Sequence, residues 1–343
     1  MKDIAQRIRF WQDFPRLDGN TRFALLAIYD KVGVPQPPLR YEFAQQRVDW
    51  AVRAWEAAME EARHVDDDSV PSLSVITGTE IFAEAMGCPV HYPDDNNPFA
   101  LPLVHSAAQA SRLRAPRWQD TRLATLFDMA DRMRSLAGPD ALLRLPDIQS
   151  PLDIAALVWD KNSFYPALME EPEAVHALIE QCKALLFSFL DDWFARYGAV
   201  YMSHYPDYVM QGGVTLSEDE IGVISPAMFR EYALPTLTQM SERYGGLGMH
   251  CCADSERQWP NLLTVPGLRM LNLCRPIKSA RESWGFFAPH VALYSFPGGE
   301  GPAPTWPAQY PRGAHAVLQF DVAGREDAQR TLDALHEAIA AMD

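Results

Sequence analysis

From about residue 141 onward, short apolar runs alternate with amphipathic helical stretches. The runs are ALLRL, AVYMS, LGMHC, LRMLNLC, VALYSF and HAVLQFDV. Repeated β–α units with apolar strands predict a parallel sheet covered by helices. Together with LSVI at 73–76 and ALLAIYD at 24–30, the runs provide the eight strands of a (β/α)8 TIM barrel. The runner-up is an open doubly wound sheet, but no G-x-G-x-x-G motif follows a first strand to support a dinucleotide site.

We expect a single domain over residues 1–343, with a helical extension at 1–65 and the barrel at 66–343. Helices are predicted where apolar residues recur at helical spacing and where capping residues, Pro or Gly mark the ends. The clearest helices fall at 41–65, 171–198, 225–246 and 325–342.

The charge balance excludes one class of partner. With 45 acidic and 30 basic residues the net charge is −15, which repels phosphate backbones, so nucleic acid is not expected to bind. No stretch is apolar for long enough to span a bilayer, and the N-terminus lacks a signal-peptide pattern. Five cysteines in a chain of this size favour reduced thiols over a disulfide framework. The cytoplasm is therefore the expected location, with no membrane partner.

The polar residues at the strand ends are the candidate site, because barrel enzymes build their sites at the carboxyl ends of the strands. Side chains alternate along a strand, so His250 and Cys252 share one face of LGMHCC and Cys251 takes the other. By the same rule, Asn272 and Cys274 should point inward from LRMLNLC. The run AVLQFDV should direct Gln319 and Asp321 inward, and we expect Asn272 and Asp321 to contact substrate.

These side chains have the nitrogen and sulfur donors that zinc prefers. We expect His250 and Cys252 to bind one zinc ion, with Cys274 or an acidic residue as the third ligand and a fourth position open. Cysteine also packs as a small buried hydrophobe, which is the alternative for both thiols and our interpretation of Cys251.

Carboxylates and a second histidine complete the candidates. Glu218 and Asp219, in the loop before the 225–246 helix, are candidate catalytic residues together with His250. The alternative for these acids is a solvated loop near a helix N-terminus, which the helix dipole favours. Glu80 in TGTEIF and His204 in MSHYPDY follow two further strand-like runs and are candidate substrate-binding residues.

Four segments, in order, resemble the uroporphyrinogen decarboxylase superfamily. They are LPDIQSPLDIAALVW, EPEAVHALIEQC, GGVTLSEDEIGVISPAMFREYALPTL and GMHCCADSERQWPNLLTVPGLRMLNL. The similarity covers roughly residues 70–275 and is poor at both ends. The resemblance implies a (β/α)8 barrel and one of two activities, since the superfamily holds tetrapyrrole decarboxylases and zinc-dependent methyltransferases linked to corrinoids.

The differences between this sequence and the decarboxylase pattern favour the methyltransferase branch of the superfamily. The decarboxylases carry an R-Q-A-G-R stretch that holds substrate carboxylates, and residues 1–40 contain nothing like it. The position of the decarboxylases' catalytic Asp falls near Gly78 or Glu80 in this chain, and the position of their catalytic Tyr falls near Leu157, so both residues are replaced. The methyltransferases bind zinc through His-x-Cys, matched by His250 and Cys252, and through a distal Cys whose region here holds Asp321 or Gln319.

The resemblance therefore implies methyl transfer to a thiol, with zinc as cofactor. The chain has no D-x-H-x-x-G corrinoid motif, so any corrinoid would arrive on a partner protein. The other expected partners are a small-molecule substrate and a second copy of the chain in a homodimer. Two alternatives stay open: a decarboxylase of uroporphyrinogen or another small acid, and a non-catalytic small-molecule-binding barrel.

Overall fold

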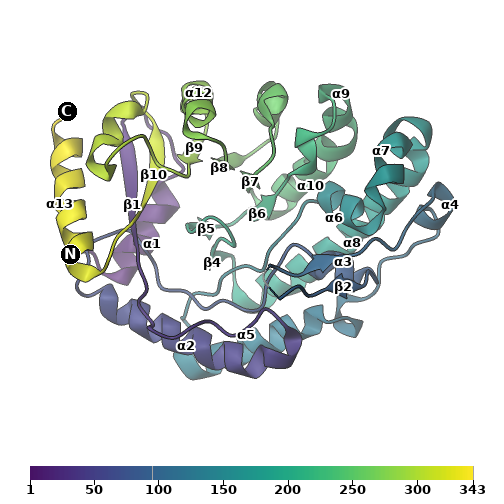
Figure 1. Ribbon diagram of the computed structural model, residues 1–343, viewed down its shortest axis with the longest axis horizontal. Coiled ribbons are helices and arrows are strands. Elements are labelled where there is room, and N and C mark those ends of the chain that lie inside the picture. Colours follow the sequence, from purple (N-terminus) through teal and green to yellow (C-terminus); the bar gives the residue numbers. More distant parts are fainter. Residues whose placement is uncertain (95, 343) are drawn as a thin grey trace.

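Six parallel strands form the central sheet of the computed structural model, which describes residues 1–94 and 96–342 (Figure 1). Their order is β1-β10-β9-β8-β7-β6, and the neighbours β1 and β10 pair along their full length from Arg22↔His315 to Ile28↔Asp321. The strands of the structure are β1 (Arg22–Ile28), β2 (Val90–His91), β3 (Phe99–Ala100), β4 (Val200–Met202), β5 (Val209–Gln211), β6 (Val214–Ser217), β7 (Leu247–Cys251), β8 (Leu268–Leu273), β9 (Ala292–Tyr294) and β10 (His315–Asp321).

Helices cover the outside of this sheet (Figure 1). They are α1 (Ile4–Asp13), α2 (Ala44–Glu61), α3 (Ile81–Ala85), α4 (Ala107–Ala110), α5 (Leu123–Ala137), α6 (Pro151–Val158), α7 (Lys161–Glu170), α8 (Pro172–Tyr197), α9 (Pro226–Met228), α10 (Leu234–Tyr244), α11 (Trp259–Leu262), α12 (Ile277–Phe287) and α13 (Arg325–Ala340). In the part of the chain that the structure describes, no helix combines the length and the apolar character needed to cross a membrane.

Short bridges and hydrogen bonds continue the sheet from one edge toward the other. Beside β1, the Asp68 N–H donates to the carbonyl of Leu25 at 2.8 Å. Isolated parallel bridges then join Leu73 to Leu143, Arg144 to Met202 in β4, and Gln149 to Ser217 in β6. The fold is therefore mixed α/β and TIM-barrel-like, as predicted. Two of the expected strands, LSVI and ALLRL, pair through bridges only.

Strand β1 lies inside the segment that the sequence assigned to a helical extension. It pairs with β10, and α13 packs against it, so the two ends of the chain lie on the same side of the molecule (Figure 1). The expected boundary at residue 65 therefore does not separate an extension from the barrel. The apolar run RFALLAI is a buried sheet strand because it continues the parallel ladder of β10.

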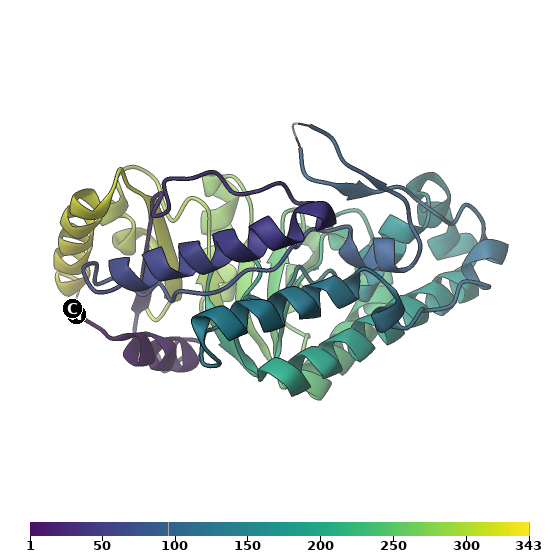
Figure 2. The same ribbon diagram turned by 90° about the horizontal axis from the view of Figure 1, so that it is seen from below.

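The four helices predicted most clearly are present. The second, α8, is 26 residues long and begins with Pro172, as expected from its sequence. The third begins at Pro226 after the Ser225 cap, continues through a π-helical turn at Phe229–Ala233, and ends at Tyr244 before Gly245, whose φ is 93°. Helices α2, α5 and α8 lie side by side along one side of the molecule (Figure 2). Their core contains rings such as Phe127, which packs edge-on against Trp193.

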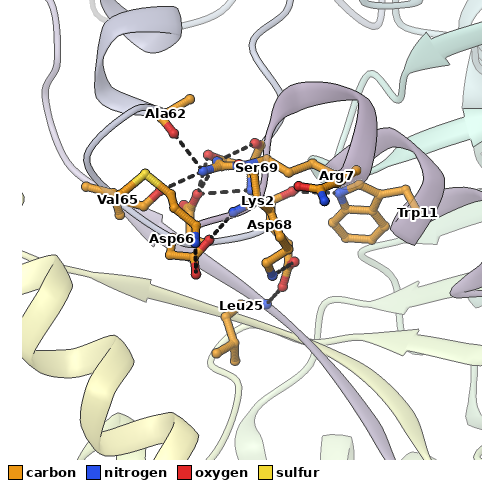
Figure 3. Close-up of polar contacts among 12 residues, drawn as sticks. Lys2, Arg7, Trp11, Leu25, Ala62, Val65, Asp66, Asp68 and Ser69 are labelled. Atoms are coloured by element: carbon orange, nitrogen blue, oxygen red, sulfur yellow. Dashed lines mark hydrogen bonds and ion pairs between the residues drawn. The ribbon is translucent and has the colours of Figure 1, made fainter.

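A buried arginine fixes α1 to the loop after α2 (Figure 3). Arg7 is 0% exposed, and its Nη1 pairs with Asp67 at 2.8 Å and donates to the Ser69 carbonyl at 2.9 Å. Its Nη2 donates to the carbonyls of Ala62 at 3.0 Å and Val65 at 2.6 Å. Because a buried charge is tolerated only when it is paired and hydrogen-bonded, this network specifies how the N-terminal helix docks.

Candidate metal centre

Three donor groups meet at the carboxyl ends of β6 and β7. One ligand atom from each of Asp219, His250 and Cys252 lies within 4.8 Å of the other two. The alternation of side chains along β7 is as predicted, because His250 and Cys252 share this face while Cys251 is fully buried on the other. We call these three residues the Asp–His–Cys cluster. It lies where barrel enzymes place their chemistry.

The imidazole of His250 is held in one orientation by the neighbouring strand. Its Nδ1 lies 2.5 Å from the Oδ1 of Asn272, and the Asn272 Nδ2 donates to the Tyr294 carbonyl at 2.7 Å. The bond to Tyr294 leaves the amide oxygen facing the ring, so Nδ1 carries the proton and Nε2 is the nitrogen left to bind a ligand. This is the hydrogen bond that a metal-binding histidine makes with its second nitrogen.

The loop that carries Asp219 is held from two sides. On one side, the buried carboxylate of Asp153 in α6 accepts the N–H groups of Asp219 at 2.7 Å and Glu220 at 3.0 Å. On the other, the Cys252 N–H donates to Asp219 Oδ1 at 2.6 Å, and the Glu218 N–H donates to the His250 carbonyl at 2.9 Å. Asp219 is therefore fixed against β7 by backbone contacts as well as by its own carboxylate.

Electrostatics around the cluster keep its thiol protonated when no metal is bound. Partial burial raises the pKa of the Cys252 thiol to about 12, although the residue as a whole is exposed, and the charge of Asp219 contributes to the rise. Burial also raises the pKa of Cys274, again with Asp219 as a second cause. Behind the loop, burial raises the pKa of both Asp153 and Glu218, which are 3% and 0% exposed. A cation placed in the cluster would meet the Cys252 thiol and the Asp219 carboxylate as well as the His250 imidazole.

The donor set fits a zinc ion. Donors around a tetrahedral zinc ion are separated by roughly 3.3–3.8 Å, given bond lengths of about 2.0–2.3 Å. The three donors lie within 4.8 Å of one another, up to about 1.0–1.5 Å beyond that separation, so side-chain rotations would be needed to bring them to one ion. One imidazole nitrogen, one sulfur and one carboxylate oxygen are all zinc ligands, and three protein ligands leave a fourth position for substrate. Cys252 is exposed, so this position can be reached from solvent.

Four other predicted residues are not donors in the cluster. Cys274 was the first choice for third ligand, but it lies outside the cluster at the end of β8, where its N–H bonds the Cys251 carbonyl at 2.9 Å. Asn272, expected to contact substrate, is 0% exposed and orients His250 instead. Glu218, expected as a catalytic acid, has both carboxyl oxygens buried. Asp321 is exposed at the end of β10.

The remaining two candidates gather around a different carboxylate. His204 Nε2 lies 3.1 Å from Asp147 Oδ2, and its Nδ1 lies 3.3 Å from the Thr77 hydroxyl. Both ring nitrogens of His204, predicted to bind substrate, are thus hydrogen-bonded within the protein. Glu80 is 3% exposed, and burial raises its pKa to about 7, with Glu84 and Asp147 contributing.

Sequence reasoning missed two contributors to the site. In the sequence SPLD, Asp153 resembles an ordinary acidic residue in the first turn of a helix. Its bonds to the Asp219 loop span 66 positions, so no local pattern indicates them. Tyr205, in the loop between β4 and β5, packs edge-on against the His250 ring with 4.9 Å between the centroids. Neither residue has a local pattern that distinguishes it, although the placement of Tyr205 beside His204 at a strand end was a signal that could have been used.

Comparisons with known proteins agree with this architecture. The model of the family described as Uroporphyrinogen decarboxylase (URO-D) matches residues 51–273. Among solved structures, a methyltransferase from Methanosarcina mazei superposes with a TM-score of 0.66 at 12% sequence identity, over 100% of this chain and 99% of that one. At this identity the likeness shows a shared fold. A search of curated proteins finds no match. The chain belongs to the uroporphyrinogen decarboxylase (URO-D) family.

Proposed function

We propose that this protein is a zinc-dependent methyltransferase that moves a methyl group to a thiol. The observation that carries the proposal is the Asp–His–Cys cluster, in which Asn272 leaves only the Nε2 of His250 free. In this proposal zinc binds Asp219, His250 and Cys252, and the thiol substrate takes the open position. Bound zinc would lower the pKa of that thiol, so that a thiolate is available at neutral pH.

The chain's own residues then have distinct roles. Cys252 and His250 bind the ion, and Asn272 holds the imidazole in the required tautomer. Asp219 supplies the third donor, and Asp153 holds the Asp219 loop through its two N–H bonds. Cys274 lies near enough for the charge of Asp219 to affect its pKa, so it borders the cluster.

A role in decarboxylating a tetrapyrrole is less well supported by the charges near the cluster. A substrate with many carboxylates needs unpaired cationic side chains to bind it. Arg144 is held by both carboxylate oxygens of Asp207, at 2.6 and 3.0 Å, and Arg275 pairs with Asp254 at 3.0 Å. Both arginines are therefore committed to acidic partners.

The proposal includes the partners and the compartment. A corrinoid protein would donate the methyl group and a small thiol would accept it, while a homodimer is a further expectation. A reducing cytoplasm suits a site that depends on the free thiol of Cys252.

Methyl transfer from free methylcobalamin to 2-mercaptoethanol tests the activity. In the reaction the thiolate sulfur bonds to the methyl carbon, the carbon–cobalt electron pair stays on cobalt, and the thiol proton passes to solvent. The zinc-loaded protein should produce cob(I)alamin and the methyl thioether. Formation of cob(I)alamin is monitored by its absorbance in the absence of oxygen. Cys252→Ala should abolish the reaction, whereas Cys251→Ala should retain it because Cys251 faces away from the cluster. Equal rates for both variants and for protein-free zinc would overturn the proposal.

A further inference from the structure

An exposed tyrosine stands over the cluster on a loop that is otherwise tightly anchored. Tyr205 is 42% exposed, and its ring meets His250 at an interplanar angle of 84°. The same ring stacks on Phe296, which follows β9, at 5.8 Å and 21°. Phe296 in turn packs against Tyr294 at 5.1 Å. We call Tyr205 and Phe296 the aromatic wall.

Polar groups hold the β4–β5 loop in place on both sides of Tyr205. Arg144 donates to the carbonyls of Ser203 at 3.0 Å and His204 at 2.9 Å, and it forms the bidentate pair with Asp207. The Ser203 N–H donates to the Tyr208 carbonyl at 2.8 Å, which closes the loop on itself. His204 is held by Asp147 and Thr77, as described above. A tyrosine fixed by so many contacts keeps its ring over the cluster without losing conformational entropy when a ligand arrives.

The wall borders the open side of the cluster. The Tyr205 ring packs edge-on against the His250 ring, with 4.9 Å between the centroids, and is itself partly exposed. The wall therefore reaches from the β4–β5 loop, beside His250, to the segment that follows β9. A group bound to the cluster beside His250 would lie against aromatic faces and edges.

We infer that the aromatic wall positions the substrate thiol and selects one whose substituent is uncharged and apolar, preferably aromatic. This inference rests on the proposed function and names its substrate class. Aromatic faces favour flat apolar groups, and the nearby arginines, Arg144 and Arg275, are paired with carboxylates and not free to bind an anion. Tyr205 and Phe296 are specificity-determining residues in this view, while the metal ligands remain the chemical groups.

Binding of two thiols to the cobalt(II)-loaded protein tests the inference. Cobalt(II) replaces zinc and reports thiolate binding through its visible absorption, so the readout needs no turnover. Benzyl mercaptan should bind more tightly than 2-mercaptoethanol to the wild type. In Tyr205→Ala this preference should fall by about 3- to 10-fold, the range expected for losing one aromatic contact. Tyr205→Phe should restore it, and Phe286→Ala, on an exposed ring of α12, should leave it unchanged.

The outcomes separate this inference from the proposed function. If the protein binds no cobalt, both the proposed function and the inference fall. If cobalt and both thiols bind but the preference is the same in Tyr205→Ala, the inference falls and the metal site stands. If Tyr205→Ala also loses cobalt, Phe296→Ala is the variant that tests the inference. Phe296 stacks on Tyr205, and its ring is not paired with the His250 ring. An unchanged preference in Phe296→Ala would then overturn the inference.

Discussion

Replacing Asn272 by Leu removes both hydrogen bonds of the buried amide while keeping nearly the same volume. The His250 ring loses its 2.5 Å contact, and the Tyr294 carbonyl loses its 2.7 Å donor. Loss of the residue that orients a ligand imidazole weakens metal binding by about 10- to 100-fold. That range corresponds to roughly 1.4–2.8 kcal/mol, at about 1.4 kcal/mol per tenfold change. The unpaired carbonyl should also lower the free energy of unfolding by about 1–3 kcal/mol.

Zinc affinity is measured by competition with a chromophoric chelator, and stability by urea unfolding of the metal-free protein. Asn261→Leu is the matched control, because Asn261 is also buried and its amide is also hydrogen-bonded: its Nδ2 donates to the Pro226 carbonyl at 3.2 Å and to Gln258 Oε1 at 2.9 Å, and its Oδ1 accepts from Arg230 at 3.2 Å. It should lose comparable stability and keep its zinc affinity. An Asn272→Leu variant that binds zinc within threefold of the wild type, or a control that weakens zinc equally, would refute the positioning role.

Three further predictions concern the N-terminal anchor, a buried acid and the thiol. Arg7→Met should lower the free energy of unfolding by about 3–5 kcal/mol, since it strands the buried carboxylate of Asp67; a loss below 1 kcal/mol in urea unfolding would contradict this. The pKa of Glu80 is raised from 4.5 to about 7 in the folded state, so its contribution to stability is present below pH 4.5 and is lost as the pH rises toward 7. The free energy of unfolding of Glu80→Gln should therefore match that of the wild type near pH 4 and exceed it by up to about 3 kcal/mol near pH 8. A difference between the two that does not change with pH would be evidence against burial of the charged group. Because the Cys252 pKa is about 12 without metal, zinc must displace its proton, and the affinity should rise about tenfold per pH unit near neutrality; a flat profile in the competition titration would mean that the thiol is not a ligand.

The architecture and part of the site follow from local patterns in the sequence. The alternation of side chains along a strand correctly placed His250 and Cys252 on one face and Cys251 on the other. The helices could be predicted from their apolar spacing and their Ser, Pro and Gly boundaries. Two predicted strands became isolated bridges instead, and a proline lies at one end of each run, Pro71 before LSVI and Pro146 after ALLRL, where it cannot donate to a ladder.

What the sequence did not reveal depends on contacts between distant segments. Asn272 was correctly expected to face inward, but its role as the partner of His250 depends on the pairing of β7 with β8, which no local pattern specifies. The choice of Asp219 over Cys274 in the cluster likewise follows from Asp153, 66 positions earlier in the chain. Tyr205 reaches His250 only because the anchored β4–β5 loop directs it there.

The metal content of the protein tests the central claim most directly. Protein purified without an affinity tag is analysed for elements as isolated and again after zinc is added and the excess removed. We predict one zinc ion per chain, with zinc–sulfur distances of about 2.3 Å and zinc–nitrogen distances of about 2.0–2.1 Å by X-ray absorption. Cys252→Ala should lose most of the zinc and remain folded. A protein that carries no zinc and takes up none when it is supplied would contradict the account.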